Sequence, residues 1–282
     1  MAAMAARSRI TARALALLAA VALALLLSGS YPMRTSAQHV SATGRTEAVW
    51  WHPPQHLTWY WQLQGTVKNS QPVAAYDIDG FENGASEVAA LHALGRHVIC
   101  YIDVGTAENF RPDYHLFPKA VLGRTNGWPG ERWLDIRRLD VLGPIMSARF
   151  QMCREKGFDA VEPDNIEAFS NRSGFPITAQ QQLAFNEWLA EAVHSLGMAV
   201  LQKNDGEQTP LLASHFDGAL SEQCNQYREC ASYQPYLDAG KPVLNAEYRL
   251  PVSRFCAADR AAGIMGARFG LALDGRLFSP CP

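Results

Sequence analysis

The chain has 282 residues, of which 48% are hydrophobic and 18% are charged. This length and balance fit one large α/β domain or two small ones with a substantial core, and they exclude a disordered chain. The formal net charge of −2 gives the chain no overall attraction for nucleic acid or for an anionic membrane. Any electrostatic preference must therefore be local.

The N-terminus has the pattern of a secretory signal peptide. Arg7, Arg9 and Arg13 precede an uncharged apolar run at residues 14–27, and small residues follow that run. The run is shorter than the ~20 residues that a membrane span needs, although an uncleaved anchor is the alternative. We therefore predict a signal peptide and cleavage region over 1–37 and a polar linker over 38–48. The mature chain is then secreted or periplasmic, without stable membrane association.

Six cysteines fit an exported protein, because an even number in that compartment predicts disulfides. They are Cys100, Cys153, Cys224, Cys230, Cys256 and Cys281. Six cysteines allow 15 complete pairings, so the sequence leaves the connectivity open. We expect a bridge in the C-terminal third of the chain. For Cys100, within the apolar stretch VICYI, the alternative is a buried free thiol.

Short β-type runs alternate with helical stretches from the Trp-rich segment WWHPPQHLTWYWQLQG onward. One helix is predicted between a cap at Ser86 and Gly95, a second over 145–156, and a third between the capping-box pair Thr178 and Gln181 and a stop at Gly197. The expected strands are residues 59–63, 73–78, 98–104, 132–136, 158–162, 199–203, 217–220 and 243–246, with 270–273 as a further candidate.

Strands that alternate with helices imply parallel βαβ units. About eight such units in the ~240 residues after the linker predict a single α/β domain, a (β/α)₈ TIM barrel over residues 49–282. The main alternative is a doubly wound open sheet. The lack of a Gly-rich phosphate loop after an early strand disfavours that alternative.

Nearly every expected strand ends in an acid, and in a barrel these ends share the rim where barrel enzymes place their chemistry. The rim acids are Asp77, Asp79, Asp103, Asp135, Glu162, Asp164, Asp205, Glu222 and Glu247. A single strand-end acid is more often part of an ion pair or a helix cap. The complete set is harder to explain in that way, because few basic residues share the rim.

Asp164 and Glu222 are the pair best placed for catalysis. The strands that end in these two acids are separated by only one other expected strand, which carries Lys203 and Asn204. Most glycoside hydrolases use two carboxyl groups that lie ~5–9 Å apart. Asn204 suits a sugar hydroxyl or a carboxylate, and Lys203 is expected to keep a nucleophile ionised. The alternative for Lys203 is a plain ion pair with Asp164 or Glu162.

Aromatic and loop residues near the rim suit a carbohydrate site. Pro163 stiffens the bend before Asp164, and Asn165 opens a polar, Gly-containing loop. Exposed rings stack on sugar faces, and Trp128 and Tyr248 are the first candidates among many aromatics that more often belong to the core.

Other chemistries find little support. The chain has no GxSxG elbow, no HExxH motif and no P-loop, and its eight histidines show no paired-ligand spacing. A Mg²⁺ or Ca²⁺ site of Asp, Glu and Asn oxygens is an alternative. We predict an enzyme without metal or cofactor.

The motifs YDIDGFEN, GRHVICYIDVGTAENFRPD, GERWLDI, GFDAVEPDN, SGFPIT, QKND, FDGALSEQCNQYREC, GKPVLNAEY and RFC occur in this order. From about Trp51 to Asp274 the chain resembles glycoside hydrolase family 114, the endo-α-1,4-polygalactosaminidases with a TIM barrel. The resemblance implies that Asp164 is the nucleophile and Glu222 the general acid/base. It also implies substrate-contacting or supporting roles for Asp77, Asp79, Glu108, Glu162, Asn204 and Glu247. Where the family often has a serine, this chain has Asp103, an additional acid.

The sequence thus predicts a secreted, monomeric endo-glycosidase that hydrolyses an α-1,4-linked, cationic galactosamine polysaccharide, with retention favoured over inversion. Two other classes stay open: a non-catalytic glycan-binding barrel, and a metal-dependent hydrolase on the same acidic rim. The substrate-binding set predicted with the catalytic pair is Asp77, Asp79, Asp103, Glu108, Trp128, Glu162, Asn165, Lys203, Asn204, Glu247 and Tyr248.

Overall fold

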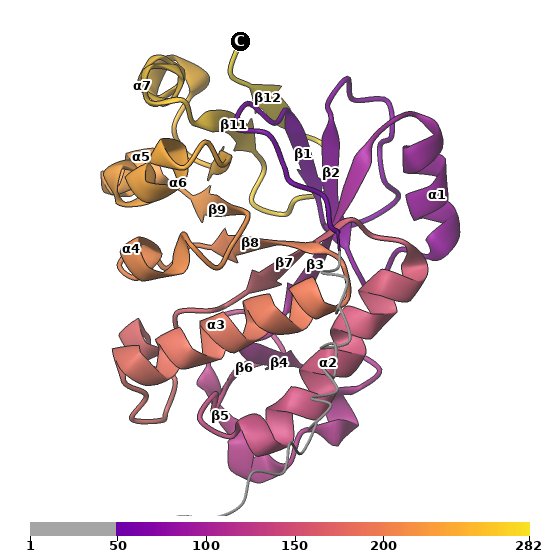
Figure 1. The fold of residues 1–282 in the computed structure, drawn as a ribbon, viewed down its shortest axis with the longest axis vertical. Coiled ribbons are helices and arrows are strands. Elements are labelled where there is room, and N and C mark those ends of the chain that lie inside the picture. The colour runs from indigo at the N-terminus through magenta and orange to yellow at the C-terminus, as the bar shows by residue number, and fades with distance from the viewer. Residues whose placement is uncertain (1–48) are drawn as a thin grey trace, which may run out of the picture. The chain divides into compact units, whose positions relative to one another are not determined.

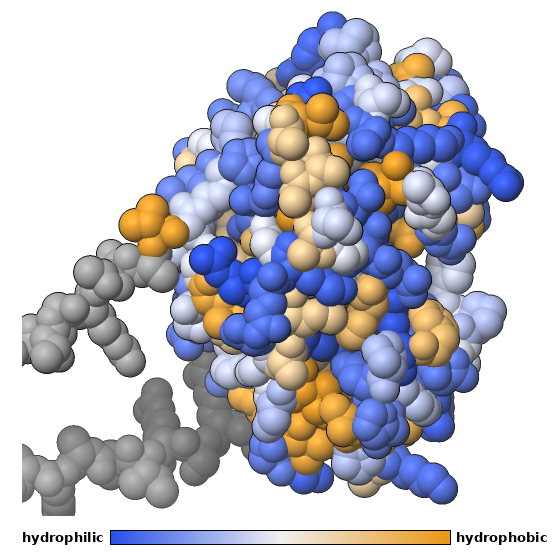
Figure 2. Space-filling view, turned by 90° about the vertical axis from the view of Figure 1, so that its right-hand side faces the viewer, coloured by the Kyte–Doolittle hydropathy of each residue, from blue (hydrophilic) through white to orange (hydrophobic). Residues whose placement is uncertain are grey.

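The structure is a computed structural model that describes residues 49–282. The predicted signal peptide (1–37) and linker (38–48) lie outside the described residues. Within the described part, no helix combines the length and apolarity needed to cross a membrane. On the face drawn in Figure 2, hydrophilic side chains predominate and hydrophobic ones lie between them in small groups.

Eight parallel strands form the barrel that the sequence predicts (Figure 1). In sheet order they are β1 (Trp59–Gln62), β2 (Ala75–Asp79), β3 (His97–Asp103), β7 (Ala160–Asp164), β8 (Ala199–Lys203), β9 (Gly218–Glu222), β10 (Val243–Glu247) and β11 (Met265–Phe269). The short β12 (Phe278–Pro280) pairs antiparallel with β11. The eight parallel strands are almost fully buried on both faces, as expected of parallel strands covered by helices.

Side chains bring the first and last barrel strands together. Trp59 Nε1 donates a hydrogen bond of 2.8 Å to the carbonyl oxygen of Met265, and the Trp59 ring centroid lies 5.1 Å from that of Phe269. Beyond the strands, the backbone N–H of Leu63 donates to the carbonyl oxygen of Leu273 at 2.9 Å. The wall therefore curls back on itself, and the open-sheet alternative is wrong.

Two strand predictions are wrong. Residues 132–136 are not a barrel strand. β6 (Glu131–Leu134) is the middle strand of a small antiparallel sheet with β4 (Thr106–Glu108) and β5 (Leu122–Thr125), inserted after β3. Asp135 therefore does not reach the rim and instead pairs with Arg137 at 2.7 Å. Residues 270–273 form a loop after β11.

Among the described residues, seven α-helices accompany the strands: α1 (Ala85–Ala93), α2 (Leu139–Lys156), α3 (Ala179–Ser195), α4 (Thr209–Leu212), α5 (Cys224–Tyr227), α6 (Gln234–Asp238) and α7 (Cys256–Ala262). The capping box at Thr178 and Gln181 is present as predicted. The helix predicted over 145–156 begins earlier, at Leu139, and accommodates Pro144 in its second turn. Ser86 does not cap α1, whose N-cap is Gly84.

All six cysteines are paired, as Cys100–Cys153, Cys224–Cys230 and Cys256–Cys281. The bridge expected in the C-terminal third is confirmed, and two bridges lie there. The free-thiol alternative for Cys100 is wrong, because this residue joins β3 to α2. Bridges that close chain loops restrict the unfolded state and so favour the folded one.

Two tryptophans that follow the linker pack near the ends where barrel strands begin, away from the strand ends that carry the acids. Trp50 stacks on His194 at 4.2 Å, and its Nε1 donates to Asp217 Oδ1 at 3.1 Å. Trp51 stacks on His97 at 4.1 Å, where β3 begins. These rings belong to the scaffold rather than to a sugar-binding groove.

Candidate active site

The carboxyl ends of the barrel strands open into a cavity of about 870 Å³. Its lining includes most of the predicted site: Asp79, Glu108, Trp128, Asp164, Asn165, Lys203, Asn204, Glu222 and Tyr248. Asp77, Asp103, Glu162 and Glu247 are buried and lie beneath this lining. The structure therefore brings these predicted residues together at one end of the barrel, where some of them line the cavity and others are buried.

Asp164, the last residue of β7, receives three hydrogen bonds. Tyr101 Oη donates to Oδ2 at 2.8 Å, while Lys203 Nζ and the backbone N–H of Asn165 donate to Oδ1 at 3.0 and 2.8 Å. The chain turns sharply here, because Asn165 has a φ of 63°. Contacts that all donate to the carboxyl oxygens suit an ionised carboxylate.

Glu222, the last residue of β9, is held from two sides. Asn204 Nδ2 donates to Oε2 at 3.0 Å, and Tyr248 Oη donates to Oε1. Asn204 also accepts the backbone N–H of Glu222 through its Oδ1 at 2.8 Å, which fixes the amide orientation. The side chain of Glu222 is 29% exposed, so it reaches the cavity while its orientation is set.

Lys203, at the end of β8, joins the two candidate catalytic carboxyl groups. Its Nζ lies 3.0 Å from Asp164 Oδ1 and 3.5 Å from Glu222 Oε2, so these oxygens are at most the sum of the two distances, about 6.5 Å, apart. Burial alone would lower the pKa of Lys203, but the surrounding carboxylates outweigh burial and raise it well above its usual range. Lys203 is therefore a permanent cation.

Asp77 and Glu162 form a second carboxyl layer below Lys203. Both are fully buried, and Glu162 Oε1 lies 2.9 Å from Lys203 Nζ. Burial, then the neighbouring Glu162, raises the pKa of Asp77 well above its usual range. Burial also raises the pKa of Glu162 to about 7, against the opposing effect of Lys203. Both shifts favour the protonated, neutral forms of these two buried carboxyl groups, and this limits the negative charge beneath Lys203.

The segment 158–169, FDAVEPDNIEAF, contains no Lys or Arg, yet two of its acids have a cationic partner from elsewhere in the chain. Lys203 arrives from the neighbouring strand and contacts both Glu162 and Asp164. The ion pair that the sequence left as an alternative is thus present. It coexists with a place in the cavity, because Lys203 also lines it.

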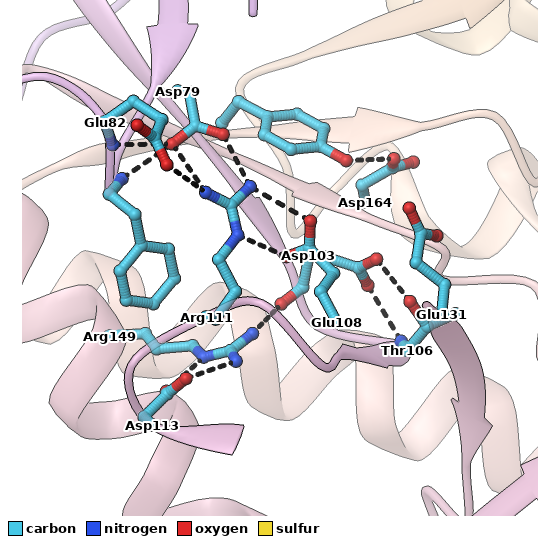
Figure 3. Close-up of polar contacts among 12 residues, drawn as sticks. Asp79, Glu82, Asp103, Thr106, Glu108, Arg111, Asp113, Glu131, Arg149 and Asp164 are labelled. Carbon is cyan, nitrogen blue, oxygen red and sulfur yellow. Dashed lines mark hydrogen bonds and ion pairs between the residues drawn. The ribbon is translucent and has the colours of Figure 1, made fainter. Parts of the chain in front are cut away.

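Arg111 neutralises a second group of acids (Figure 3). Its guanidinium lies 2.6 Å from Asp79 and 2.8 Å from Glu108, and it reaches Glu82 at 3.5 Å. The side chains of Asp79 and Glu108 are each only 4% exposed. These two predicted substrate contacts therefore already have a protein partner, and they shape the wall of the cavity beside it.

Asp103 and Glu247 hold the chain just beyond the two catalytic candidates. Asp103 accepts hydrogen bonds from the backbone N–H of Thr106 at 2.8 Å and from Asn165 Nδ2 at 2.9 Å. Glu247 accepts the backbone N–H of Asn225 at 2.9 Å, just beyond Glu222. Gly105 packs against the same turn so closely that a Cβ there would collide with the Asn165 carbonyl oxygen.

Some residues of the cavity were not identified from the sequence as site residues, among them Tyr101, Arg111, Glu131 and Glu167. Glu167 Oε2 is buried without a hydrogen-bond partner among the described residues, and burial raises the pKa of Glu167 to about 8. Period-two alternation along β3 places Tyr101 on the face of Asp103, a signal that could have found it. Arg111 lies in the loop after β4, and no local sequence pattern indicates that it belongs to the site.

Asp205 gives a testable pH dependence of stability. It is 7% exposed, its Oδ1 has no partner among the described residues, and burial raises its pKa to about 8. The folded state therefore keeps a proton that the unfolded state releases near pH 4, so stability is lost as pH rises from 4 through 8.

The free energy of unfolding should therefore fall between pH 6 and pH 9, and in Asp205→Asn this fall should be smaller by about 2 kcal/mol. Chemical denaturation at both pH values measures this, with exposed Asp238→Asn as the control. An unchanged pH dependence in Asp205→Asn would contradict the buried proton.

Within residues 49–282, no group of three or more His, Cys, Asp and Glu side chains is arranged to hold a metal ion. The parallel barrel and the paired carboxylates at its mouth define a glycoside hydrolase of the TIM-barrel class. Residues 40–278 match the model of the Glycoside-hydrolase family GH114. The chain belongs to this family.

Solved structures agree with this assignment. The structure of Ega3 from Aspergillus fumigatus in complex with galactosamine is 32% identical in sequence, with a TM-score of 0.78 over 84% of this chain and 100% of that one. The glycoside hydrolase domain of PelA from Pseudomonas aeruginosa is 13% identical, with a TM-score of 0.60 over 79% and 97% of the two chains, and supports the fold. An uncharacterized protein from Deinococcus radiodurans is 28% identical over 73% of this chain and 75% of its own length.

Proposed function

We propose that this protein is an exported endo-glycosidase that cleaves α-1,4-linked galactosamine polysaccharide with retention of configuration. Asp164 acts as the nucleophile and Glu222 as the general acid/base. The observation that carries the proposal is the shared contact of both carboxyl groups with Lys203, which keeps their oxygens within about 6.5 Å. Retaining glycosidases hold their carboxyl groups ~5–5.5 Å apart, whereas inverting ones leave ~6.5–9.5 Å for a water molecule.

The first chemical step forms a glycosyl ester. The Asp164 carboxylate attacks the anomeric carbon while Glu222 protonates the departing glycosidic oxygen, so that one bond forms as the other breaks. Tyr101 and Lys203 hold the Asp164 carboxylate for this attack. Glu222 then takes a proton from water, which attacks the same carbon and releases Asp164. Asn204 and Tyr248 keep Glu222 in place through both steps.

Charge in the cavity supports the substrate class. Deacetylated galactosamine is cationic near neutral pH, and acidic side chains dominate the charged lining of the cavity. The net charge of −2 for the whole chain is small, so this preference belongs to the cavity rather than to the surface in general. The galactosamine bound in the similar Ega3 structure is of the same chemistry.

The test is incubation of the purified protein with partly deacetylated galactosaminogalactan. We expect new reducing ends and an early ladder of oligomers, which marks cleavage within the polymer. The same polymer after complete N-acetylation, and chitosan with its β-linked glucosamine, are the controls for charge and for linkage. An NMR spectrum of the first product reports its anomeric configuration. Absence of cleavage of every deacetylated galactosamine polymer would overturn the proposal.

Salt should weaken this activity through substrate binding. Raising NaCl from about 20 mM to about 1 M shortens the Debye length from roughly 20 Å to 3 Å, so we expect KM for the cationic polymer to rise roughly tenfold with kcat little changed. Initial rates at several salt concentrations measure both constants. A KM that is independent of ionic strength would show that the acidic cavity does not attract the polymer.

A further inference from the structure

The turn between β5 and β6 carries an unusually exposed tryptophan. Trp128 is 53% exposed, yet it lines the same cavity as Asp164 and Glu222. Positive φ angles at Gly127 and Gly130, 108° and 88°, shape the turn on either side of it. An indole held in this way keeps a large apolar face in water, which costs free energy unless another ring covers it.

Hydrogen bonds hold the turn in a defined conformation. Asn126 Oδ1 accepts the backbone N–H of Trp128 at 3.0 Å, and Asn126 Nδ2 donates to Glu131 Oε2 at 2.5 Å. The carbonyl oxygen of Gly130 accepts the backbone N–H of Asn109 at 2.9 Å. One amide side chain therefore fixes both the start of the turn at Trp128 and the carboxyl group of Glu131.

Glu131 differs from the acids beside it because no cation among the described residues pairs with it. In the part of the chain that the structure describes, Arg111 forms ion pairs with Asp79, Glu82 and Glu108, and none of the ion pairs includes Glu131. Figure 3 shows its carboxyl group turned toward the side of the cavity where Asp164 lies. Asn126 occupies one oxygen of Glu131 and leaves the other to the cavity.

We propose that Trp128 and Glu131 form a second sugar subsite, next to the catalytic pair, that selects a galactosamine unit with a free amine. The pyranose ring stacks on the Trp128 indole, and its ammonium group pairs with the Glu131 carboxylate. An N-acetylated unit keeps the stacking but loses the ion pair, so the subsite distinguishes the two. This inference rests on the proposed function and names the residues that read the charge of a neighbouring unit.

The chemistry of the subsite matches the two halves of an aminosugar. The C–H face of the sugar is apolar and suits an aromatic ring, whereas the amine of the sugar requires an anionic or oxygen partner. A carboxylate that is half-buried at the cavity wall pairs more strongly with an ammonium group than an exposed one does. Burial raises the pKa of Glu131 above its usual range. A cation that binds beside Glu131 acts in the opposite direction and favours the ionised carboxylate.

The test compares Glu131→Gln and Trp128→Ala with wild type on three substrates: a deacetylated galactosamine oligomer, its N-acetylated counterpart, and an aryl α-galactosaminide too short to reach the turn. We expect each variant to raise KM for the deacetylated oligomer roughly tenfold with kcat within about twofold of wild type. Glu131→Gln should also reduce the preference for the deacetylated oligomer over the acetylated one. On the aryl glycoside both variants should lose much less than on the deacetylated oligomer, because this substrate makes few contacts with the turn.

Binding gives a readout without turnover. In an Asp164→Asn background, calorimetry should show the same roughly tenfold loss of oligomer affinity when Glu131→Gln is added. Exposed Glu155→Gln and Leu211→Ala are the matched controls and should keep wild-type values. Wild-type KM in both turn variants, or an equal loss on the aryl glycoside, would overturn the subsite while leaving the proposed function in place. A wild-type protein inactive on all galactosamine substrates would overturn both.

Discussion

Asp164→Asn and Glu222→Gln should each lower kcat on the galactosamine polymer by roughly 10³-fold or more, with the folded structure retained. Each substitution keeps the size of the side chain and removes one chemical property. The amide introduced by Asp164→Asn cannot form the glycosyl ester, and the amide introduced by Glu222→Gln cannot give up a proton to the leaving group. Reducing-end assays measure the loss, and exposed Asp140→Asn is the control. The double variant should lose little more than either single one, because the two groups act as a unit.

Azide separates the two roles. With an activated aryl glycoside that needs no protonation of its leaving group, Glu222→Gln should form the glycosyl ester, and azide should then release an α-glycosyl azide. In Asp164→Asn, azide can replace the nucleophile itself and should give the β-glycosyl azide. The same azide product from both variants, or full activity in both, would show that the roles are assigned incorrectly.

Lys203→Met should destabilise the folded protein by about 3–5 kcal/mol at pH 8, because it leaves Glu162 and Asp164 in the barrel without their shared cation. The loss should be smaller at pH 5, where Glu162, whose pKa is raised to about 7, is protonated. Chemical denaturation at both pH values measures the difference. Activity should also fall, since the contact that brings Asp164 and Glu222 together is gone.

A matched pair of variants tests this explanation. Adding Glu162→Gln to Lys203→Met should restore part of the stability, because it removes one of the two uncompensated charges. Exposed Lys119→Met should behave as wild type. A further loss in the Lys203→Met/Glu162→Gln double variant would show that packing, rather than charge, explains the effect of Lys203.

The elements that were predicted correctly are those whose signals are local. The capping box of α3 needs only Thr178 and Gln181, three residues apart, and its end needs only Gly197. The buried barrel strands β3, β7 and β8 are visible in the sequence as apolar runs bounded by turn residues. The alternation of most barrel strands with helices then restricts the topology to very few folds.

The elements that were missed lack such signals. A short apolar run has the same appearance in an antiparallel hairpin as in a parallel barrel strand, so the sequence predicts residues 132–136 as part of the barrel wall. In β11, Gly266 and Arg268 interrupt the apolar pattern, so the sequence predicts no strand at 265–269 and favours 270–273, which is the following loop. In both cases the pairing partner decides the structure, and that partner lies far away in the sequence.

The sequence by itself determined the alternation of strands and helices, the acids where the barrel strands end, and thereby the candidate pair Asp164 and Glu222. Only the tertiary structure decided which partner each of those acids has. It placed Lys203 between the pair, gave Arg111 to Asp79 and Glu108, and left Glu131 without a protein cation among the described residues. The reason is physical: strand patterns arise from neighbours along the chain, whereas electrostatic partners depend on distances through space.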